Sequence, residues 1–216
     1  MNVSWRAADG SQVAAGAIVC EIRGAARSIV TGERTALNFL QTLSGTATAT
    51  RALVALVAGT RARILDTRKT LPGLRRAQKY AVLCGGGTNH RIGLFDAVLV
   101  KENHVTTAGG VREAVRSAHR NSPGVMVEVE VETLAELADA LQTDADRIML
   151  DDFSLEDMRK AVALRDAHDG KRKELEASGS MTADNVRAVA ETGVDFISSG
   201  AITKHLHAID FSLRFV

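Results

Sequence analysis

The sequence predicts an α/β fold in which parallel strands form a barrel. Short apolar segments recur through residues 63–198, helical patterns separate most of them, and each segment ends in a charged or small polar residue. Strands that alternate with helices are typical of parallel sheets with right-handed crossovers. Polar residues at the ends of six strands favour a barrel, because a doubly wound sheet concentrates its chemistry at one switch point.

The first part of the chain predicts short strands and then a long helix. Glycine-marked turns surround the apolar run Ala17–Cys20 within residues 1–30, which indicates short strands and tight turns. Residues Glu33–Ala58 are rich in Ala and Leu and contain no proline, which predicts a helix. Ser44 and Gly45 interrupt this pattern, so we expect either two helices or one kinked helix.

The remainder predicts six strands with intervening helices. The expected strands cover Arg63–Asp66, Ala97–Val100, Val125–Val131, Arg147–Leu150, Lys173–Ala177 and Phe196–Ser198. The expected helices cover Val111–His119, Thr133–Leu141, Leu155–Leu164 and Ala183–Glu191. The alternating residues Phe211–Phe215 are compatible with one more strand at the end of the chain.

Composition sets limits on the partners. The 216 residues are 45% hydrophobic and 25% charged, as in an ordinary globular enzyme of one domain or one domain plus a fragment. A net charge of +1 predicts no broad attraction to nucleic acid or to a membrane surface. Without a membrane-spanning segment or a signal peptide, we expect a cytoplasmic protein whose Cys20 and Cys84 are reduced thiols.

Basic residues gather around a glycine run between residues 67 and 104. Arg68 and Lys69 follow the first expected barrel strand, and Arg91 follows Gly85–Gly87 and His90. Two guanidinium groups with a lysine predict a site for a small dianion, whereas isolated arginines would pair with surface acids. The glycines are compatible with either a plain turn or a close approach of the backbone to a ligand.

Carboxylates and small residues end the later strands. Glu130 and Asp151 end consecutive strands, where they could bind a divalent ion, accept hydrogen bonds from sugar hydroxyls, or balance Lys69 and Lys101. Two turns of small residues each follow a strand and precede a helix: they comprise Ser178, Gly179 and Ser180, and Ser198, Ser199 and Gly200. Such turns predict a phosphate site, or ordinary turns with serine N-caps.

Motifs along nearly the whole chain resemble the quinolinate phosphoribosyltransferase family, also called nicotinate-nucleotide pyrophosphorylases (carboxylating). They occur in the order of that family and comprise Gly32–Leu40, Leu43–Thr48, Leu65–Gly73, Gly85–Arg91, Lys101–His104, Glu128–Val131, Leu150–Asp151, Glu176–Gly179 and Ser199–Gly200. Each motif alone is weak evidence, but together they are highly specific.

The resemblance implies an incomplete, open α/β barrel beside the remnant of an N-terminal α/β sandwich domain. We expect the sandwich remnant at residues 1–32, joined by residues 208–216, and the barrel at residues 33–207. The implied reaction is the transfer of phosphoribosyl from phosphoribosyl pyrophosphate (PRPP) to quinolinate with Mg²⁺. It gives nicotinate mononucleotide, carbon dioxide and pyrophosphate, a step of de novo NAD biosynthesis.

The resemblance also implies roles for individual residues. The quinolinate pocket would comprise Thr67, Arg68, Lys69, His90, Arg91 and Lys101, completed by Arg34 from the neighbouring subunit of a homodimer that could pair further into a hexamer. The PRPP site would comprise Lys69, Lys101, Glu130, Asp151, Ser178, Gly179, Ser180, Ser198, Ser199 and Gly200. Lys69, Lys101, Glu130 and Asp151 would be the catalytic residues, and Glu130 and Asp151 would hold the metal through PRPP.

The sequence departs from the family pattern in three respects. Its N-terminal segment is shorter than that of the family, so we expect a chain that begins late or has been shortened. Asp152 stands where asparagine is frequent, and Ser180 where glycine or asparagine is frequent. Two alternative functions are a related transferase that acts on another acid, as in the ModD-type proteins, and a shortened chain that binds anions without turnover.

Overall fold

Six parallel strands form the central sheet of the computed structural model, which describes all 216 residues. The strands are β3 (Arg63–Leu65), β4 (Ala97–Val100), β5 (Met126–Val131), β6 (Arg147–Asp151), β7 (Glu174–Ser178) and β8 (Phe196–Ser198). Their order is β3-β8-β7-β6-β5-β4, so the first strand pairs with the last while β3 and β4 stay apart. The expected α/β barrel of parallel strands is confirmed, and its open side lies between β3 and β4.

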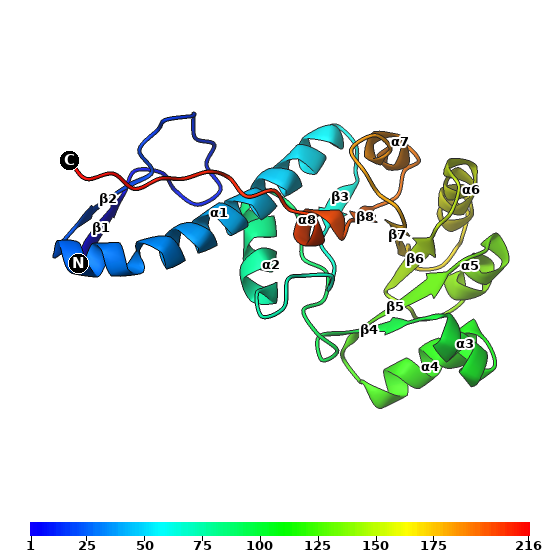
Figure 1. Cartoon of the computed structure of the whole chain (residues 1–216). Coiled ribbons are helices and arrows are strands. Elements are labelled where there is room, and N and C mark those ends of the chain that lie inside the picture. Colours follow the sequence, from blue (N-terminus) through cyan, green and yellow to red (C-terminus); the bar gives the residue numbers. More distant parts are fainter.

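Helices follow the strands and surround the sheet (Figure 1). They are α2 (Arg75–Cys84), α3 (Glu102–Ala108), α4 (Val111–Asn121), α5 (Leu134–Leu141), α6 (Leu155–Asp166), α7 (Val186–Ala190) and α8 (Ala201–Lys204). The four predicted helices are α4 to α7, and α7 is shorter than predicted. The hydroxyls of Thr133 and Ser154 cap α5 and α6 by accepting hydrogen bonds from backbone N–H groups, which fixes where these helices begin.

Side chains alternate between the two faces of each strand, and the two faces differ in chemistry. In β5, Val127, Val129 and Val131 face outward and join the apolar core between the sheet and the helices. Glu128 and Glu130 occupy the intervening positions and are buried on the barrel side. Most of the hydrophobic core therefore lies outside the barrel, and its interior is partly charged.

One uninterrupted helix, α1 (Ala26–Leu56), precedes the barrel, so the expectation of two separate helices at Ser44–Gly45 is wrong. A methyl group at Gly45 would lie 2.2 Å from the carbonyl oxygen of His207. Gly45 is therefore the point where the C-terminal segment crosses the helix. The glycine serves a close approach between two segments and leaves the helix intact.

The N-terminal half of α1 extends away from the barrel beside a small sheet and the C-terminal segment (Figure 1). The sheet pairs β1 (Asn2–Trp5) with β2 (Cys20–Arg23) in antiparallel register. The strand expected at Phe211–Phe215 is wrong, because this segment has no regular secondary structure and runs beside α1 (Figure 1). It is held instead by Gln41, whose side-chain amide donates to the carbonyl of Phe211 (3.0 Å).

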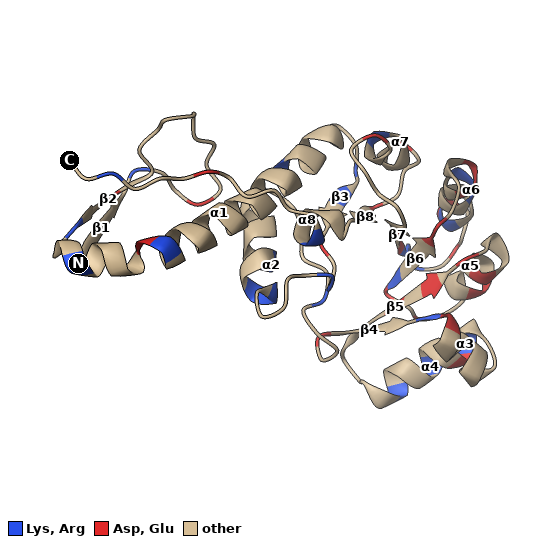
Figure 2. Ribbon diagram, in the orientation of Figure 1, with Lys and Arg blue, Asp and Glu red and all other residues tan.

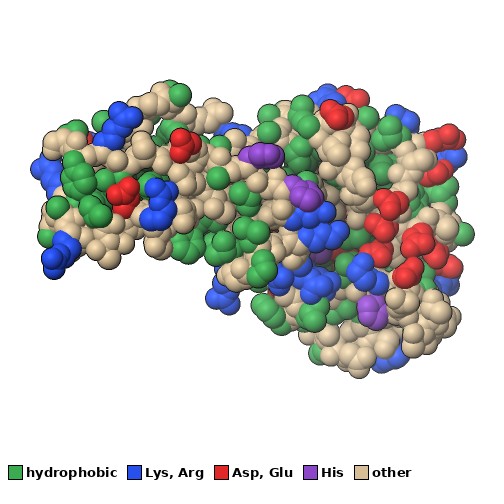
Figure 3. All heavy atoms as spheres, viewed as in Figure 1, with side chains coloured by type: hydrophobic (Ala, Val, Ile, Leu, Met, Phe, Trp, Pro, Cys, Tyr) green, Lys and Arg blue, Asp and Glu red, His purple; other side chains and the backbone are tan.

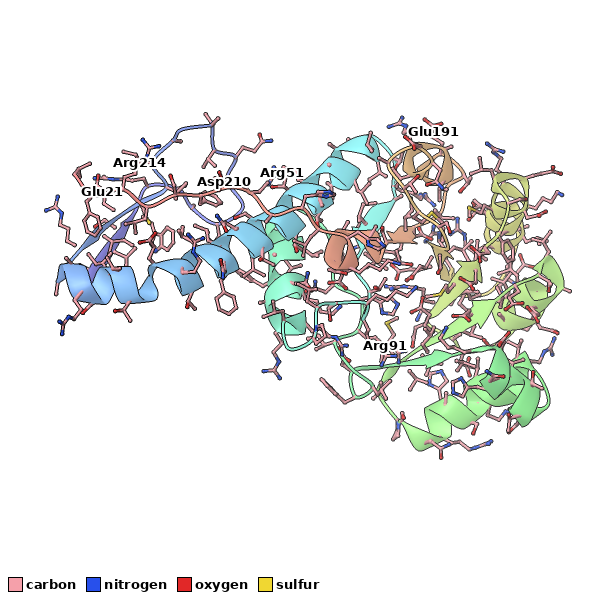
Figure 4. The ribbon with its side chains drawn as sticks, viewed as in Figure 1. Glu21, Arg51, Arg91, Glu191, Asp210 and Arg214 are labelled. Atoms are coloured by element: carbon pink, nitrogen blue, oxygen red, sulfur yellow. The ribbon has the colours of Figure 1, made fainter.

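The boundary expected between residues 32 and 33 falls inside α1. Further along that helix, Arg51 joins the N-terminal loop to the barrel: its guanidinium donates to the carbonyls of Gly10 (2.7 Å) and Cys84 (3.3 Å) (Figure 4). No helix has the length and apolar character needed to cross a membrane.

Candidate active site

The residues after β3 lie against those after β8. A methyl group at Gly200 would lie 3.1 Å from the side chain of Lys69 and 3.3 Å from the hydroxyl of Thr67. The hydroxyl of Thr203 in α8 donates to the backbone carbonyl of Lys69 (2.7 Å). The pairing of the first and last strands thus brings together two groups of predicted site residues that are far apart in the sequence.

Three of the predicted cations have no acidic partner. No carboxylate lies within 4.0 Å of the charged groups of Arg68, Lys69 or Arg91, although other surface arginines form ion pairs. Burial lowers the pKa of Arg91, and the nearby guanidinium of Arg68 lowers it further. The charges of Glu128 and Asp96 oppose this shift, but neither forms an ion pair with Arg91. Two guanidinium groups that repel each other and lack a direct ion-pair partner favour the binding of an anion. Basic side chains gather on this face of the barrel, beside acidic ones (Figure 3).

The glycine run before Arg91 packs against α1. A methyl group at Gly85 would lie 2.5 Å from the carbonyl oxygen of Ala47, and one at Gly87 would lie 2.7 Å from the side chain of Thr50. Gly85 and Gly86 form the turn that ends α2, with a φ of 88° at Gly86, so the interpretation as a plain turn is confirmed. These glycines also let α1 and the end of α2 approach each other. The next residue, Thr88, forms an isolated parallel bridge with Leu65 and begins the segment that fills the open side of the barrel.

His90 lies in this segment and is buried beneath the cations. Its Nδ1 accepts the backbone N–H of Arg91 (2.7 Å), so we assign the ring proton to Nε2. Nε2 lies 2.8 Å from a carboxylate oxygen of Glu128 and 3.5 Å from one of Glu176. Burial lowers the pKa of His90, in agreement with a neutral ring. Both ring nitrogens are thus engaged within the protein.

The cluster of His90, Glu128 and Glu176 has the spacing of a metal site, since its potential ligand atoms all lie within 4.8 Å of one another. Two contacts argue against a metal there. Nε2 carries a proton because Nδ1 is an acceptor, and the guanidinium of Arg147 already lies 3.4 Å from Glu176. Burial, and next the charge of Glu128, raise the pKa of Glu176 to about 8, so this cluster holds a proton at neutral pH.

Lys101 and Glu130 form an ion pair of 2.6 Å. The alternative in which the carboxylate of Glu130 balances Lys101 is therefore confirmed. No carboxylate lies within 4.0 Å of Lys69, and in that case the same interpretation is wrong. The backbone N–H of Lys101 donates to Nδ1 of His104 (2.9 Å), which fixes the start of α3. Asp151 ends β6 next to Ser178 on β7.

The two small-residue turns differ from serine N-caps. Helix α7 begins after Asn185 and α8 after Gly200, and neither has a side-chain cap. The hydroxyl of Ser199 is buried and has no hydrogen-bond partner. Such an orphaned buried hydroxyl is available to a ligand.

Asp152 and Gly179 explain the shape of the other turn. Asp152 has a positive φ of 50°, a conformation that asparagine and aspartate tolerate. A methyl group at Gly179 would lie 2.4 Å from its carboxylate. Both residues line a cavity of about 220 Å³ together with Ser178 and Ser180.

Arg34 does not join these residues within the chain. It is exposed in the N-terminal half of α1, which points away from the ends of the barrel strands (Figure 1). The other predicted residues lie within or after β3 to β8, and Figure 2 shows basic residues after β3 and acidic residues on β5.

Sequence reasoning missed several residues that hold the site together. Arg75 donates to the backbone carbonyls of Arg68 and Ile92, both at 3.2 Å, and so connects the two basic segments. Asp66 and Lys79 form a buried ion pair beside His90. A polar residue at the end of an apolar strand was the only signal for Asp66, because its partner is on another element.

Comparison with known proteins gives one family over nearly the whole chain. Residues 46–214 match the C-terminal domain of quinolinate phosphoribosyl transferase, and residues 1–44 match its N-terminal domain. The structure resembles the nicotinate-nucleotide pyrophosphorylase of Francisella tularensis with a TM-score of 0.92 and 52% identity, over 97% of this chain and 73% of the other.

Curated relatives agree with that result. The nicotinate-nucleotide pyrophosphorylase [carboxylating] of Mycobacterium leprae is 43% identical over 98% of this chain and 74% of its own length. The chloroplastic protein of the same name from Oryza sativa is also 43% identical, over 99% of this chain, which spans 61% of that longer relative.

Proposed function

Because the chain belongs to the quinolinate phosphoribosyltransferase family, we propose that it transfers phosphoribosyl from PRPP to quinolinate with loss of carbon dioxide. The products are nicotinate mononucleotide, carbon dioxide and pyrophosphate, in de novo NAD biosynthesis. The observation that carries this proposal is the group of Arg68, Lys69 and Arg91, which have no acidic partner at the ends of the barrel strands.

Quinolinate suits this group because it carries two adjacent carboxylates. The guanidinium groups of Arg68 and Arg91 are near enough to depress a pKa, and a dicarboxylate between them relieves their repulsion. Lys69 and the hydroxyl of Thr67 both lie beside Gly200, and we propose that Lys101, at the start of α3, contacts the same substrate. His90 contributes by holding the backbone N–H of Arg91, since both its ring nitrogens are engaged.

PRPP suits the neighbouring strand ends. The unpaired hydroxyl of Ser199 and the backbone around Gly200 support binding of its 5′-phosphate, together with Ser198 and with the turn of Ser178, Gly179 and Ser180. The carboxylates of Glu130 and Asp151 are suited to accept hydrogen bonds from the ribose hydroxyls. Lys69 lies beside Gly200 and can contact both substrates.

The reaction needs alignment and charge neutralisation more than a strong base. The pyridine nitrogen of quinolinate forms a bond to C1′ of the ribose as the bond from C1′ to pyrophosphate breaks, and the electron pair leaves with pyrophosphate. Lys69 and Lys101 neutralise the leaving group. The C2–carboxylate bond then breaks, its electrons remain at C2 beside the cationic ring nitrogen, and a proton from solvent completes the product.

Mg²⁺ is part of the proposal, and the residues present suit it. Glu130 and Asp151 provide the hard oxygen ligands that this ion prefers, with the remaining positions left to water and phosphate oxygens. Glu102, Glu132 and Glu136 surround a small cavity of about 60 Å³ beside Glu130, and the charge of Glu102 raises the pKa of Glu132. The ion would supply positive charge to the pyrophosphate.

We propose a homodimer in which Arg34 of each chain completes the site of the other. Arg34 is exposed and lies far along α1 from the barrel strands. We call β1, β2 and the N-terminal half of α1 the extension. Exposed apolar side chains of the extension, which a partner subunit would cover, are Val3, Trp5, Val30 and Phe39.

The deciding experiment measures release of carbon dioxide from quinolinate labelled at its 2-carboxylate, with PRPP and Mg²⁺. We expect release that depends on both substrates and stops when Mg²⁺ is chelated. Nicotinate is the matched control, because it lacks the carboxylate that is lost. Turnover of nicotinate without turnover of quinolinate would identify a related transferase, and quinolinate binding without turnover would identify an inactive chain.

A further inference from the structure

We propose that Asp66, Lys79 and Asn89 form a buried anchor that orients Arg91 toward the acid substrate. The three residues act as positioning residues, since Asp66 and Lys79 are buried and the half-buried Asn89 donates its side-chain amide to both of them. This inference rests on the proposed function, because it concerns the quinolinate half of that site. The anchor joins the end of β3, the middle of α2 and the segment that fills the open side of the barrel.

Asp66 is the centre of the anchor. Its fully buried carboxylate pairs with the ammonium group of Lys79 and accepts the side-chain amide of Asn89 (2.6 Å) and the backbone N–H of His90 (2.8 Å). Three donors from two segments therefore converge on one side chain. A buried carboxylate with this many partners has a single favourable arrangement.

Lys79 holds the same segment from the other side. Its ammonium group also donates to the carbonyl of His90 (2.8 Å), and the backbone carbonyl of Lys79 accepts the amide of Asn89 (2.9 Å). Both the N–H and the carbonyl of His90 are thus fixed. Burial raises the pKa of Asp66 and lowers that of Lys79, while their mutual contact opposes both shifts.

The direction of Arg91 depends on this fixed backbone. Its guanidinium makes a single hydrogen bond within the chain, from Nη1 to the carbonyl of Ala97 (3.2 Å), and the rest of its donors remain free. The preceding peptide, at His90, is held by Asp66 and Lys79. Asp66 also immediately precedes Thr67 and Arg68. One anchor therefore fixes the backbone next to both guanidinium groups of the predicted dicarboxylate site, those of Arg68 and Arg91.

The chain offers a matched control at the opposite end of the barrel. Asp195 comes just before β8 and is also buried; it accepts hydrogen bonds from Arg165 (2.7 Å), Arg172 (2.6 Å) and the backbone N–H of Leu175 (2.9 Å). Asp66→Asn and Asp195→Asn therefore each remove a buried charge with three donors. Only the first lies beside the predicted site.

The test compares full-length chains with these substitutions by calorimetric titration of quinolinate and by steady-state kinetics with PRPP. We expect Asp66→Asn to weaken quinolinate binding by between about tenfold and about 100-fold, as a misplaced binding group does, with the KM for PRPP within about twofold of the unaltered chain. Arg91→Ala should likewise weaken quinolinate binding and leave the KM for PRPP nearly unchanged. Asp195→Asn should lower the melting temperature and keep normal quinolinate binding.

Asn89→Ala provides a second measurement if Asp66→Asn does not fold, because it removes one amide and leaves the ion pair in place. We expect a smaller loss in the same direction, of about threefold to tenfold. Unchanged quinolinate binding in Asn89→Ala or Asp66→Asn, or equal loss for both substrates, would overturn the inference and leave the proposed function standing. If the unaltered chain neither binds nor converts quinolinate, the proposed function fails first.

Discussion

At the scale of the residue, the most unusual feature is the set of carboxylates inside the barrel. Glu128 and Glu176 are fully buried, and three of their four oxygens have no hydrogen-bond partner of good geometry. Two carboxylates side by side in a buried site cannot both be ionised at low cost, so they hold a proton between them. The guanidinium of Arg147 offsets the remaining negative charge, and the neutral ring of His90 directs its Nε2 proton toward Glu128.

The shifted pKa of Glu176 predicts how pH affects stability. Its value of about 8 in the folded chain lies above the ordinary value of 4.5. Between these values the unfolded chain loses a proton that the folded chain keeps, so Glu176 lowers the free energy of unfolding as pH rises. Glutamine cannot lose this proton, so the Glu176→Gln variant should not show this decline. We expect the difference in free energy of unfolding, Glu176→Gln minus the unaltered chain, to rise by about 1–3 kcal/mol between pH 5 and pH 8.

Urea denaturation at several pH values measures this difference. Glu174→Gln is the matched control: it removes a carboxylate that also contacts Arg147, but its side chain is 42% exposed. Water screens that position, so the relative stability of this variant should vary little with pH. A relative stability of Glu176→Gln that is flat from pH 5 to pH 8 would contradict a protonated Glu176 in the folded chain.

Sequence could predict the cations of the site but not the residues that hold them. Four of these cations follow strands or a glycine run, and their clustering indicates a ligand: they are Arg68, Lys69, Arg91 and Lys101. Asp66 and Lys79 are 13 positions apart and become partners only because α2 packs beneath the segment of His90. A pairing between two elements has no local pattern, so reasoning from motifs could not find it.

At the scale of the element, α1 joins the barrel to the extension, and its glycines have opposite roles. Gly45 faces the carbonyl of His207, whereas Gly32 in the same helix has no neighbouring atom within 4 Å of the position of a methyl group. Replacement by alanine favours the helix at both positions, by about 0.5–1 kcal/mol. Only at Gly45 does the added methyl group meet another segment.

We therefore expect Gly45→Ala to lower the free energy of unfolding by about 1–3 kcal/mol, because the C-terminal segment must shift to make room. Gly32→Ala should raise it slightly. Thermal unfolding of the two variants under identical conditions measures the contrast. Equal stabilisation by both substitutions would mean that residues 207–208 do not lie against the helix.

The elements themselves were predictable where a periodic pattern spans the whole segment. The six barrel strands are apolar, bounded by polar residues, and were found within a few residues of their ends. The sequence analysis did not predict α2, α3 or α8. In α3 and α8, seven and four residues are too few to show a helical period. Phe211–Phe215 alternates like a strand, yet it pairs with no strand, and Gln41 of α1 binds the backbone carbonyl of Phe211 instead.

At the scale of the whole molecule, the features of the extension support the proposed homodimer. All four residues of β1 are exposed, and two strands with half a helix bury too little apolar surface to be stable alone. Exposed Trp5 and Phe39 lie in this extension, and so does Arg34. In the proposed dimer, a second copy covers the extension, and Arg34 of the first copy enters the site at the strand ends of the second. Activity would then require dimer formation.

Mixed dimers test this arrangement directly. Arg34→Ala chains have an intact barrel site, and Lys101→Ala chains have an intact Arg34, so each is expected to be inactive alone. In a mixed dimer, the barrel of the Arg34→Ala chain receives Arg34 from the Lys101→Ala chain, and one of the two sites is complete. Random exchange of equal amounts makes half of the dimers mixed, so about a quarter of the unaltered activity should return.

The controls for this experiment separate a shared site from other causes of inactivity. Mixing either inactive chain with an Arg34→Ala, Lys101→Ala double variant should restore nothing, because no site in those dimers is complete. Subunit exchange is verified by mass spectrometry of chains that carry different tags. Exchange without recovery would show that Arg34 does not complete the neighbouring site, and recovery with the double variant would show that the returning activity does not come from a shared site.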